Sequence, residues 1–487
     1  AVLTGSGLGG TSLINANVAA QPEPEILAHP AWPAVLRNDA EALQSHFDEV
    51  RYLLDVQQDP NAAQTLKFRT AKSTVEALGG EYKAADLAVN FGDTVNNCGV
   101  KQPSCTRCGN CVTGCNIGAK STLATNLIPL AKQNGAEFYT GATVLSLKRA
   151  GSKWLVRYRL TSTSGTLRAG QTYTIEADTV ILAAGTLGST EILQRSKELE
   201  GLSLSHQLGK RFSTNGDNLS GIYAQASAVN ANANTYQTND NANTGPTITG
   251  IGRVPVKNQG SQHIRATLTY EDGAVPGALS TVYNELVATS AAMNRLVKRD
   301  LPAWFKTTEG KGADPLAAHA GAINHTQTVL TMGDDFAAGE IRFNVNNAAH
   351  PDAASAKAHW PKHEPNPALE YCHHLLNDQD RSDALDGGQY VPNTAWQPVP
   401  AGLGAEMSGP MPTGVALTVH PLGGCGMGDN VESGVVNDQC QVFNPSDNQT
   451  GLHPNLYVMD GSIIPTALGI NPFLTIAAIA HRASKNI

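Results

Sequence analysis

The sequence predicts an α/β protein of two domains, one of which is an antiparallel sheet covered by helices. The length of 487 residues exceeds what one compact core usually holds. Thr179 to Ala184 is a continuous apolar run followed by a glycine turn and a helical pattern, which is typical of a buried parallel strand. Alternating apolar stretches at 264–270 and 341–345, with a helical pattern at 284–297 between them, indicate the antiparallel sheet.

The composition narrows the class of protein. Charged residues make up 16% of the chain, against about 25% in typical globular proteins, and the formal net charge is −8. There is no basic tract, so nucleic acid and anionic membranes are not expected partners. No apolar run reaches the roughly 20 residues needed to cross a bilayer. The low charge and the abundance of Asn, Thr and Ser favour an exported protein, periplasmic or secreted, over a cytoplasmic one.

The chain opens on a glycine-rich loop, GSGLGGTSLINANV, for which several interpretations remain open. Gly5, Gly7 and Gly10 fit the dinucleotide fingerprint G-x-G-x-x-G, and acidic residues follow at Glu23 and Glu25. Only four residues precede the first glycine, which is short for the strand that this fingerprint requires. The alternatives are a glycine-rich cofactor loop of another type and an ordinary loop. A helical pattern then runs from residue 22 to about residue 58.

A run of cysteines follows, with the spacing C-x2-C-x2-C-x3-C. Half of the eight cysteines lie in this run, at Cys105, Cys108, Cys111 and Cys115. Disulfides this close together would close strained, very small loops, and a zinc site usually draws on two separated pairs of ligands. An iron–sulfur cluster accepts closely spaced thiolates, and the run has the bacterial ferredoxin spacing, although Asn116 stands where a proline is usual. The cluster is the favoured interpretation, with zinc and disulfides or free thiols as alternatives.

The next segments predict strands and helices that face a nucleotide. A helix is expected from Leu123 to Gln133, and strands at 138–148, 154–160 and 173–175. The buried strand at 179–184 delivers Gly185 to the start of a helix, where backbone N–H groups can face a ligand. Residues 230–243, rich in Asn, Ala and Thr, predict a long loop.

The C-terminal stretch has the same strand, loop and helix order. Residues 455–459 form a short apolar run, Asp460-Gly461 ends it, and Asn471-Pro472 opens an apolar helix. His420, in the sequence HPLGGCGMG, and Asn471 are the polar side chains best placed for chemistry. The plainer alternatives are a buried structural histidine and a helix N-cap asparagine.

This C-terminal stretch resembles the signature of the glucose–methanol–choline (GMC) flavoenzymes, and within them the cholesterol oxidases. The pattern HPLGG, NLYV-x-DGS-x-IP and G-x-NPF-x-TI is present almost entire, and GSGLGGTSLIN is similar to a second motif of the family. The resemblance implies that FAD is the cofactor and that a discontinuous FAD-binding domain comprises residues 1–20, 98–225 and 415–487. Residues 21–97 and 226–414 would form the substrate domain.

The resemblance also implies roles for individual residues. Catalysis would rest on His420 and Asn471, with Glu271 as a third member because YEDGAVPGAL is similar to the cholesterol oxidase segment that carries an active-site glutamate; a surface turn is the alternative. His420 would take the hydroxyl proton and FAD the hydride. The implied cofactor contacts are Gly9, Gly10, Asn15, Val144, Gly185, Asp460, Gly461 and Pro472.

Two further expectations concern a second polypeptide and an iron–sulfur cofactor. The family places a first βαβ unit before its glycine-rich motif, and this sequence begins after that point, so we expect a second polypeptide or segment to supply the unit. CVTGCNIGAK is similar to the segment of FAD-dependent glucose dehydrogenases that holds an iron–sulfur cluster. A [3Fe–4S] or [4Fe–4S] cluster here would pass electrons from the flavin to an acceptor protein or quinone.

The sequence therefore predicts an FAD-dependent dehydrogenase of a hydrophobic alcohol, a sterol among the candidates, with an iron–sulfur cluster as the electron exit. Two alternatives stay open. One is an O₂-using sterol or alcohol oxidase with structural cysteines, and the other is a catalytically silent electron-transfer or binding subunit.

Overall fold

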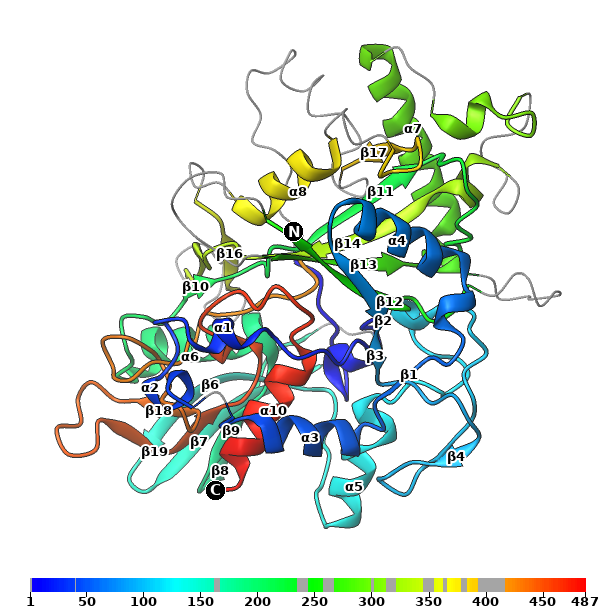
Figure 1. Ribbon diagram of the computed structural model, residues 1–487. Coiled ribbons are helices and arrows are strands. Elements are labelled where there is room, and N and C mark those ends of the chain that lie inside the picture. The colour runs from blue at the N-terminus through cyan, green and yellow to red at the C-terminus, as the bar shows by residue number, and fades with distance from the viewer. Residues whose placement is uncertain are drawn as a thin grey trace.

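The computed structural model describes residues 2–39, 41–161, 167–233, 244–256, 267–298, 302–311, 321–344, 354–361, 366–377, 383–392 and 417–487 (Figure 1). Its helices are α1 (Pro24–Leu27), α2 (Ala34–Arg37), α3 (Gln44–Leu53), α4 (Leu66–Ala77), α5 (Leu127–Gln133), α6 (Gly185–Glu200), α7 (Ser280–Lys298), α8 (Pro367–Asn377) and α10 (Phe473–Ser484). Within these residues, none of the helices combines the length and the apolar character that crossing a membrane requires.

The largest sheet has six antiparallel strands and forms the upper half of the molecule in Figure 1. In sheet order, the strands are β17 (Gln389–Val391), β11 (Asn218–Tyr223), β14 (Gln327–Met332), β13 (Thr267–Gly273), β12 (Gly250–Pro255) and β2 (Glu81–Ala84). Side chains alternate between the two faces, as the pleat of a strand requires. Ile222 and Tyr390 pack with α4 and α8, whereas Tyr223 and Val391 pack with α7. An antiparallel sheet with a helical cover is present as predicted, and β13 holds part of the stretch 264–270, but the stretch 341–345 lies in part on a strand of another sheet, Gly339–Arg342.

The lower half in Figure 1 is built on two smaller sheets and the helices around them. One is the antiparallel sheet of β6 (Ala142–Ala150), β7 (Lys153–Thr161) and β8 (Leu167–Ala177). The other has the order β18 (Gln441–Phe443), β19 (Leu452–Val458) and β9 (Val180–Leu182). Among the described strands, β9 and β19 form the one parallel ladder, so strands from the middle and the end of the chain meet here.

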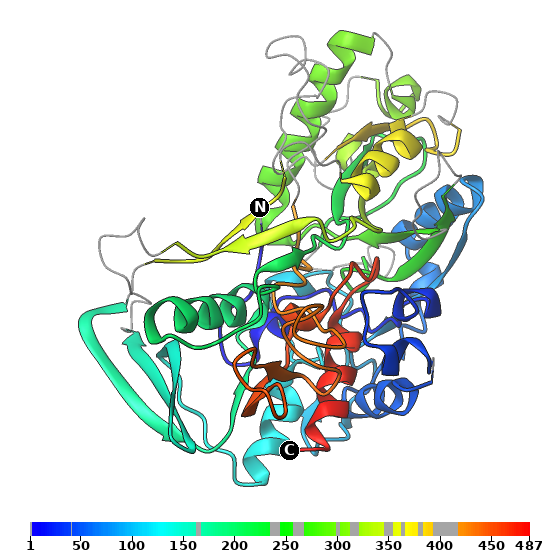
Figure 2. The same cartoon turned by 90° about the vertical axis from the view of Figure 1, so that its left-hand side faces the viewer.

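Three smaller sheets complete the fold. They are β10 (Lys210–Phe212), β15 (Gly339–Arg342) and β16 (Lys357–His359); β1 (Gln57–Gln58) and β3 (Asp86–Leu87); and β4 (Thr94–Val95) and β5 (Lys101–Gln102). The first of these lies between the two halves in Figure 2.

Several segments differ from the sequence-based expectation. The single helical pattern of residues 22–58 is three helices, because Pro24 begins α1 and Pro33 is the N-cap of α2, and proline breaks a continuous helix. The strand predicted as buried is parallel, as expected, but β9 lies at the edge of its sheet and Ile181 is 47% exposed. Of the predicted loop 230–243, residues 234–243 lie outside the described residues.

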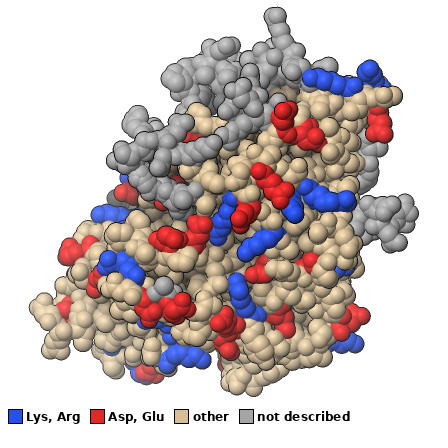
Figure 3. Space-filling model, in the orientation of Figure 1, with Lys and Arg blue, Asp and Glu red and all other residues tan. Residues whose placement is uncertain are grey.

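The hydrophobic core of the lower half unites both ends of the chain. Trp32 and Phe47, from the region of α1 to α3, are buried in one cluster with Leu193 of α6 and Leu474 of α10. α3 lies beside α10 in Figure 1. Residues 24–54 therefore pack with the core of the lower half, whereas β11 lies in the six-stranded sheet. On the face shown in Figure 3, basic and acidic side chains are interspersed and no large basic patch forms.

Candidate active site

His420 lies directly after an extended segment that one carboxylate holds in place. Asp217 Oδ1 accepts a hydrogen bond from His420 Nδ1 at 2.9 Å. Its other oxygen, Oδ2, accepts from Thr418 Oγ1 at 2.9 Å, Val419 N at 2.9 Å and His420 N at 3.1 Å. The imidazole is therefore fixed through Nδ1, and among the described residues Nε2 has no hydrogen-bond partner.

The glycines after His420 have a structural reason. Leu422 pairs with Ser213 through two backbone hydrogen bonds, which brings the HPLGG segment against residues 211–213. A Cβ on Gly423 would lie 1.8 Å from the carbonyl oxygen of Arg211, and its φ is 80°. Only glycine fits this close approach of two backbones. The motif therefore fixes the position of the backbone that follows His420.

Asn471 and Glu271 form the second part of the site. Asn471 Nδ2 donates to Glu271 Oε2 at 3.3 Å, and both side chains are buried. Their remaining oxygens, Asn471 Oδ1 and Glu271 Oε1, are buried without a hydrogen-bond partner. Pro472 is the N-cap of α10 and makes no side-chain capping bond, so the amide of Asn471 is not used as a helix cap. Buried polar atoms without partners are uncommon and often mark a place that a ligand completes.

Asn471 and Glu271 are in direct contact, and the turn 215–217 bonds both to His420 and to the loop before Asn471. The charge of Asp217, the partner of His420, contributes to raising the pKa of Glu271. Burial is the main cause of this shift and raises that pKa to about 8, while the hydrogen bond from Asn471 opposes it. Glu271 is therefore a protonated carboxylic acid at neutral pH. Because Oε2 accepts from Asn471, the proton lies on Oε1.

The shifted pKa of Glu271 predicts how stability depends on pH. An unfolded glutamate has a pKa near 4.5, so between pH 4.5 and about 8 the folded protein retains a proton that the unfolded chain releases. Stability from this group is complete below pH 4.5 and falls by up to about 1.4 kcal/mol per pH unit until pH 8. We expect Glu271→Gln to remove this slope. Urea unfolding of the FAD-loaded proteins at pH 6 and pH 8 should show a loss that is about 2–3 kcal/mol larger in the wild type. Equal losses in the two proteins would contradict the assignment of a buried, neutral Glu271.

The residues expected to contact FAD include two glycines with open space beside them. Gly10 and Gly185 have φ of 56° and 77°, and a Cβ on either would meet no atom within 4 Å. Gly10 begins a 3-10 helix, Gly10–Leu13, and Gly185 begins α6. Asn15 lies beyond this 3-10 helix, and its carbonyl accepts a hydrogen bond from Lys120 Nζ at 2.6 Å. Gly9, with φ of 102°, precedes the 3-10 helix as its N-cap.

Asp460, expected at the cofactor, is held by protein donors. Oδ2 accepts from Gly185 N at 3.0 Å and Ser189 Oγ at 2.5 Å, and Oδ1 accepts from the backbone and hydroxyl of Ser462. It therefore joins the start of α6 to the strand β19. Gly461 lies against Thr186, where a Cβ would approach Oγ1 to 2.8 Å. Val144 lies on β6 opposite Tyr158 and is half-buried.

The fit of FAD to this region rests on one further side chain. Asn17 is 1% exposed, has a positive φ of 69°, and neither polar atom of its side chain has a hydrogen-bond partner. Asn15 Oδ1 accepts from its backbone N–H at 3.3 Å, so it belongs to the same glycine-rich loop. The unpaired amide of Asn17 and the free space beside Gly10, on one loop, suit a polar cofactor such as FAD.

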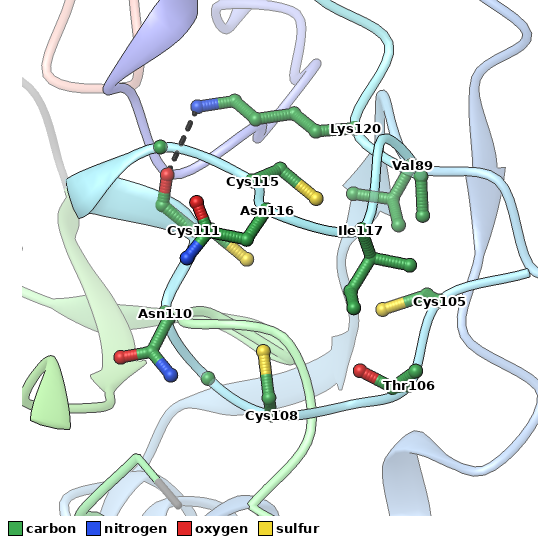
Figure 4. Close-up of a pocket in the computed structure, with 13 residues that line it drawn as sticks. Val89, Cys105, Thr106, Cys108, Asn110, Cys111, Cys115, Asn116, Ile117 and Lys120 are labelled. Atoms are coloured by element: carbon green, nitrogen blue, oxygen red, sulfur yellow. Dashed lines mark hydrogen bonds between the residues drawn. The ribbon is translucent and has the colours of Figure 1, made fainter. Parts of the chain in front are cut away.

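The cysteine run lines a cavity of about 90 Å³ (Figure 4). The sulfurs of Cys105, Cys108, Cys111 and Cys115 turn toward this cavity from one loop. Burial, together with the three neighbouring cysteines, raises the pKa of the Cys105 thiol to about 12. Lys120 donates to the carbonyl of Cys111 at 3.2 Å, and burial lowers its pKa to about 8.

The structure does not show a metal site here. Over the part of the chain that is described, no group of three or more His, Cys, Asp or Glu side chains is arranged to hold a metal ion. The eight cysteines are all unpaired, so of the alternative of disulfides or free thiols only free thiols agree with the structure. A zinc ion needs four ligands at about 2.0–2.3 Å, and the thiols around the cavity do not have that geometry.

Sequence reasoning missed Asp217, Asn215 and Lys67. Asn215 Oδ1 accepts from the backbone of Leu468 and Gly469, both at 2.8 Å, and thereby holds the loop before Asn471. The sequence offered one weak signal for Asn215 and Asp217, the turn-forming Asn-Gly-Asp at 215–217.

The comparisons with known proteins show the family of this chain. Two family models described as GMC oxidoreductase match residues 1–215 and 369–480. The cholesterol oxidase of Mycobacterium tuberculosis is 26% identical over 517 residues, covering 99% of this chain and 78% of the relative. That of Acinetobacter baumannii is 26% identical over 519 residues, covering 100% and 81%.

Solved structures share the fold at low identity. An FAD-dependent oxidoreductase from Chaetomium thermophilum aligns with a TM-score of 0.55 and 16% identity, covering 99% of this chain and 86% of that one. A fungal aryl-alcohol oxidase aligns with a TM-score of 0.54 and 13% identity, covering 99% and 85%.

These matches bear on two earlier expectations. The comparisons do not support a first βαβ unit supplied by a second polypeptide or segment; the amino-terminal family model matches residues 1–215. The catalytically silent subunit is not supported either, because the matched family consists of enzymes. The chain belongs to the GMC oxidoreductase family, the FAD-containing flavoproteins that oxidise alcohols.

Proposed function

We propose that this enzyme oxidises the hydroxyl group of a hydrophobic alcohol of the sterol class and passes the electrons to an external acceptor through an iron–sulfur cluster. The catalytic part is supported by three polar atoms without a hydrogen-bond partner among the described residues, two of which lie on segments that the turn 215–217 holds. They are His420 Nε2, Asn471 Oδ1 and Glu271 Oε1, each on a residue whose other polar atoms are fixed by the protein.

The three side chains divide the work on the hydroxyl group. His420 Nε2 accepts its proton, since Nδ1 is occupied by Asp217. The protonated Glu271 donates a hydrogen bond to the alcohol oxygen, and Asn471 holds Glu271 in place through its own hydrogen bond. FAD, when bound, accepts the hydride from the carbinol carbon. Glu271, at 0% exposure, and Asn471, at 5%, keep this place shielded from water.

The substrate class rests on the relatives. Two cholesterol oxidases match this chain over nearly its whole length, whereas likeness of fold does not fix a substrate. Anaerobic mixing with cholesterol and with straight-chain primary alcohols should bleach the flavin absorption fastest with the sterol. If no alcohol of either type reduces the flavin, the proposed activity is wrong.

The electron route rests on the four thiols around one cavity. Cysteine thiolates are the usual ligands of a cluster of iron and sulfide, and four thiols from one loop line this cavity. The backbone N–H of Thr247 donates to Cys111 Sγ at 3.5 Å, and the carbonyl of Thr247 accepts from Lys67. Lys67 in turn binds Asp272, which is next to Glu271 in the chain. This hydrogen-bonded path joins the cavity to the strand that carries Glu271.

Cysteine substitution tests the cluster. We expect protein purified without oxygen to contain iron and sulfide and to show a broad shoulder near 400 nm that reductant bleaches. Cys111→Ser should lose iron, sulfide and shoulder while it keeps FAD and its reduction by alcohol. Cys440→Ser, a buried cysteine outside the run, is the matched control and should keep all of them. If the wild-type protein contains no iron, the proposed electron transfer through a cluster is wrong. The proposed oxidation of the alcohol would be unaffected by that result.

The second candidate is an O₂-using sterol or alcohol oxidase with structural cysteines. It is favoured by the name of the full-length relatives, cholesterol oxidase, and by the absence of a metal-holding group in the described residues. Stoichiometric hydrogen peroxide from iron-free protein would support it.

A further inference from the structure

The turn Asn215–Gly216–Asp217 contacts both parts of the active site. Asp217 binds the segment that ends in His420 through four hydrogen bonds. On the other side, Asn215 accepts from two backbone N–H groups of the loop before Asn471, and its Nδ2 donates to Ile470 O at 2.9 Å. One short turn therefore sets where the imidazole and the carboxamide lie relative to each other.

The turn itself is rigidly held. Asn215 and Gly216 have φ of 58° and 63°, and a Cβ on Gly216 would lie 2.5 Å from Gly333 O. The buried Asp335 accepts hydrogen bonds from the hydroxyls of Ser213 and Thr214, the two residues before the turn. A carboxylate mounted on such a turn keeps a fixed orientation.

We infer that Asp217 is a positioning residue that selects the tautomer of His420 in which Nε2 is unprotonated and can accept the substrate proton. This inference rests on the proposed function. A carboxylate can only accept hydrogen bonds, so His420 Nδ1 must carry a hydrogen. In the reaction the alcohol O–H bond breaks, its proton forms a bond to Nε2, and the imidazolium keeps its Nδ1–H bonded to Asp217 Oδ1.

An amide at position 217 would invert this arrangement. Three donors, Thr418 Oγ1 and the N–H groups of Val419 and His420, point at Oδ2. In Asp217→Asn the amide oxygen satisfies these donors, so the amide nitrogen faces His420 Nδ1. Nδ1 then becomes an acceptor, and the hydrogen moves to Nε2, which can no longer take a proton.

The experiment compares FAD-loaded wild type with Asp217→Asn in anaerobic stopped-flow reduction by cholesterol. The limiting rate should fall by about 10²–10⁴-fold, the size expected for a wrong tautomer or a lost general base. The cholesterol concentration for half-maximal rate should change by less than about threefold, since binding is not the target. Nitrogen-15 NMR of histidine-labelled protein, assigned with His420→Gln, should show Nε2 of His420 unprotonated in the wild type and protonated in the variant.

Asp335→Asn is the matched control, because it makes the same substitution at a buried acid that supports the same turn without contacting His420. It should lower the thermal midpoint while leaving Nε2 unprotonated. An unchanged tautomer in Asp217→Asn, or an equal rate loss in the two variants, would overturn the inference. If His420→Ala still reduces the flavin, the proposed function itself fails; if His420→Ala is inactive and Asp217→Asn is fully active, only the inference fails.

Discussion

Replacement of His420 by alanine is expected to slow flavin reduction by alcohol by at least about 10²–10⁴-fold, the contribution of a general base. Its Nε2 is the one basic atom among the three predicted catalytic side chains, since Glu271 is neutral at pH 7 and an amide does not accept protons. FAD content should remain at the wild-type level. The loss should appear in the limiting rate of anaerobic reduction.

His206→Ala provides the matched control. His206 is 56% exposed beside Glu432 on the surface, so its removal should leave the rate unchanged. Undiminished reduction in His420→Ala would remove this histidine from the mechanism. Loss of FAD from the variant would instead assign it to cofactor binding.

Replacement of Lys67 by methionine is expected to destabilise the protein by about 3–5 kcal/mol, the cost of leaving a buried charge without its partner. Lys67 and Asp272 are both fully buried and form an ion pair. Burial lowers the pKa of Lys67, and the neighbouring Asp272 opposes that shift. Asp272 also accepts from Tyr82 OH at 2.9 Å and from the backbone of Thr249 and Gly250, so the whole network depends on this pair.

Two further variants make the Lys67 experiment decisive. Lys72→Met, on the same helix, removes an exposed partner of Glu76 and should cost under about 1 kcal/mol in urea unfolding. Lys67→Met combined with Asp272→Asn removes both charges and should recover part of the loss. If Lys67→Met unfolds at the same urea concentration as Lys72→Met, the buried pair does not stabilise the fold.

The sequence predicted those parts of the site that lie on continuous motifs. Gly185 at the start of α6 and Asn471-Pro472 at the start of α10 could be placed because strand, turn and helix signals are local. The antiparallel sheet followed from period-two alternation in the same way. The breaks in the helical pattern at Pro24 and Pro33 are local signals of the same kind.

The missed residues act through contacts that no local pattern records. Asp217 meets His420 across 203 positions, and Lys67 meets Asp272 across 205. A lone Asp or Lys has no periodic signature, and its role appears only when the fold brings its partner close. The neutral state of Glu271 has the same origin, since burial by distant segments sets its pKa.

The alternation of Glu271 and Asp272 along β13 has a consequence for folding. One side chain meets Asn471 and the other meets Lys67, on opposite faces of the same strand. A shift of β13 by one position would exchange these faces. Lys67 would then lack its counter-ion, and Glu271 would point away from Asn471. A sheet with a shifted register is therefore less stable than the native one. The polar residues of the site thus also favour the correct pairing of the strands during folding.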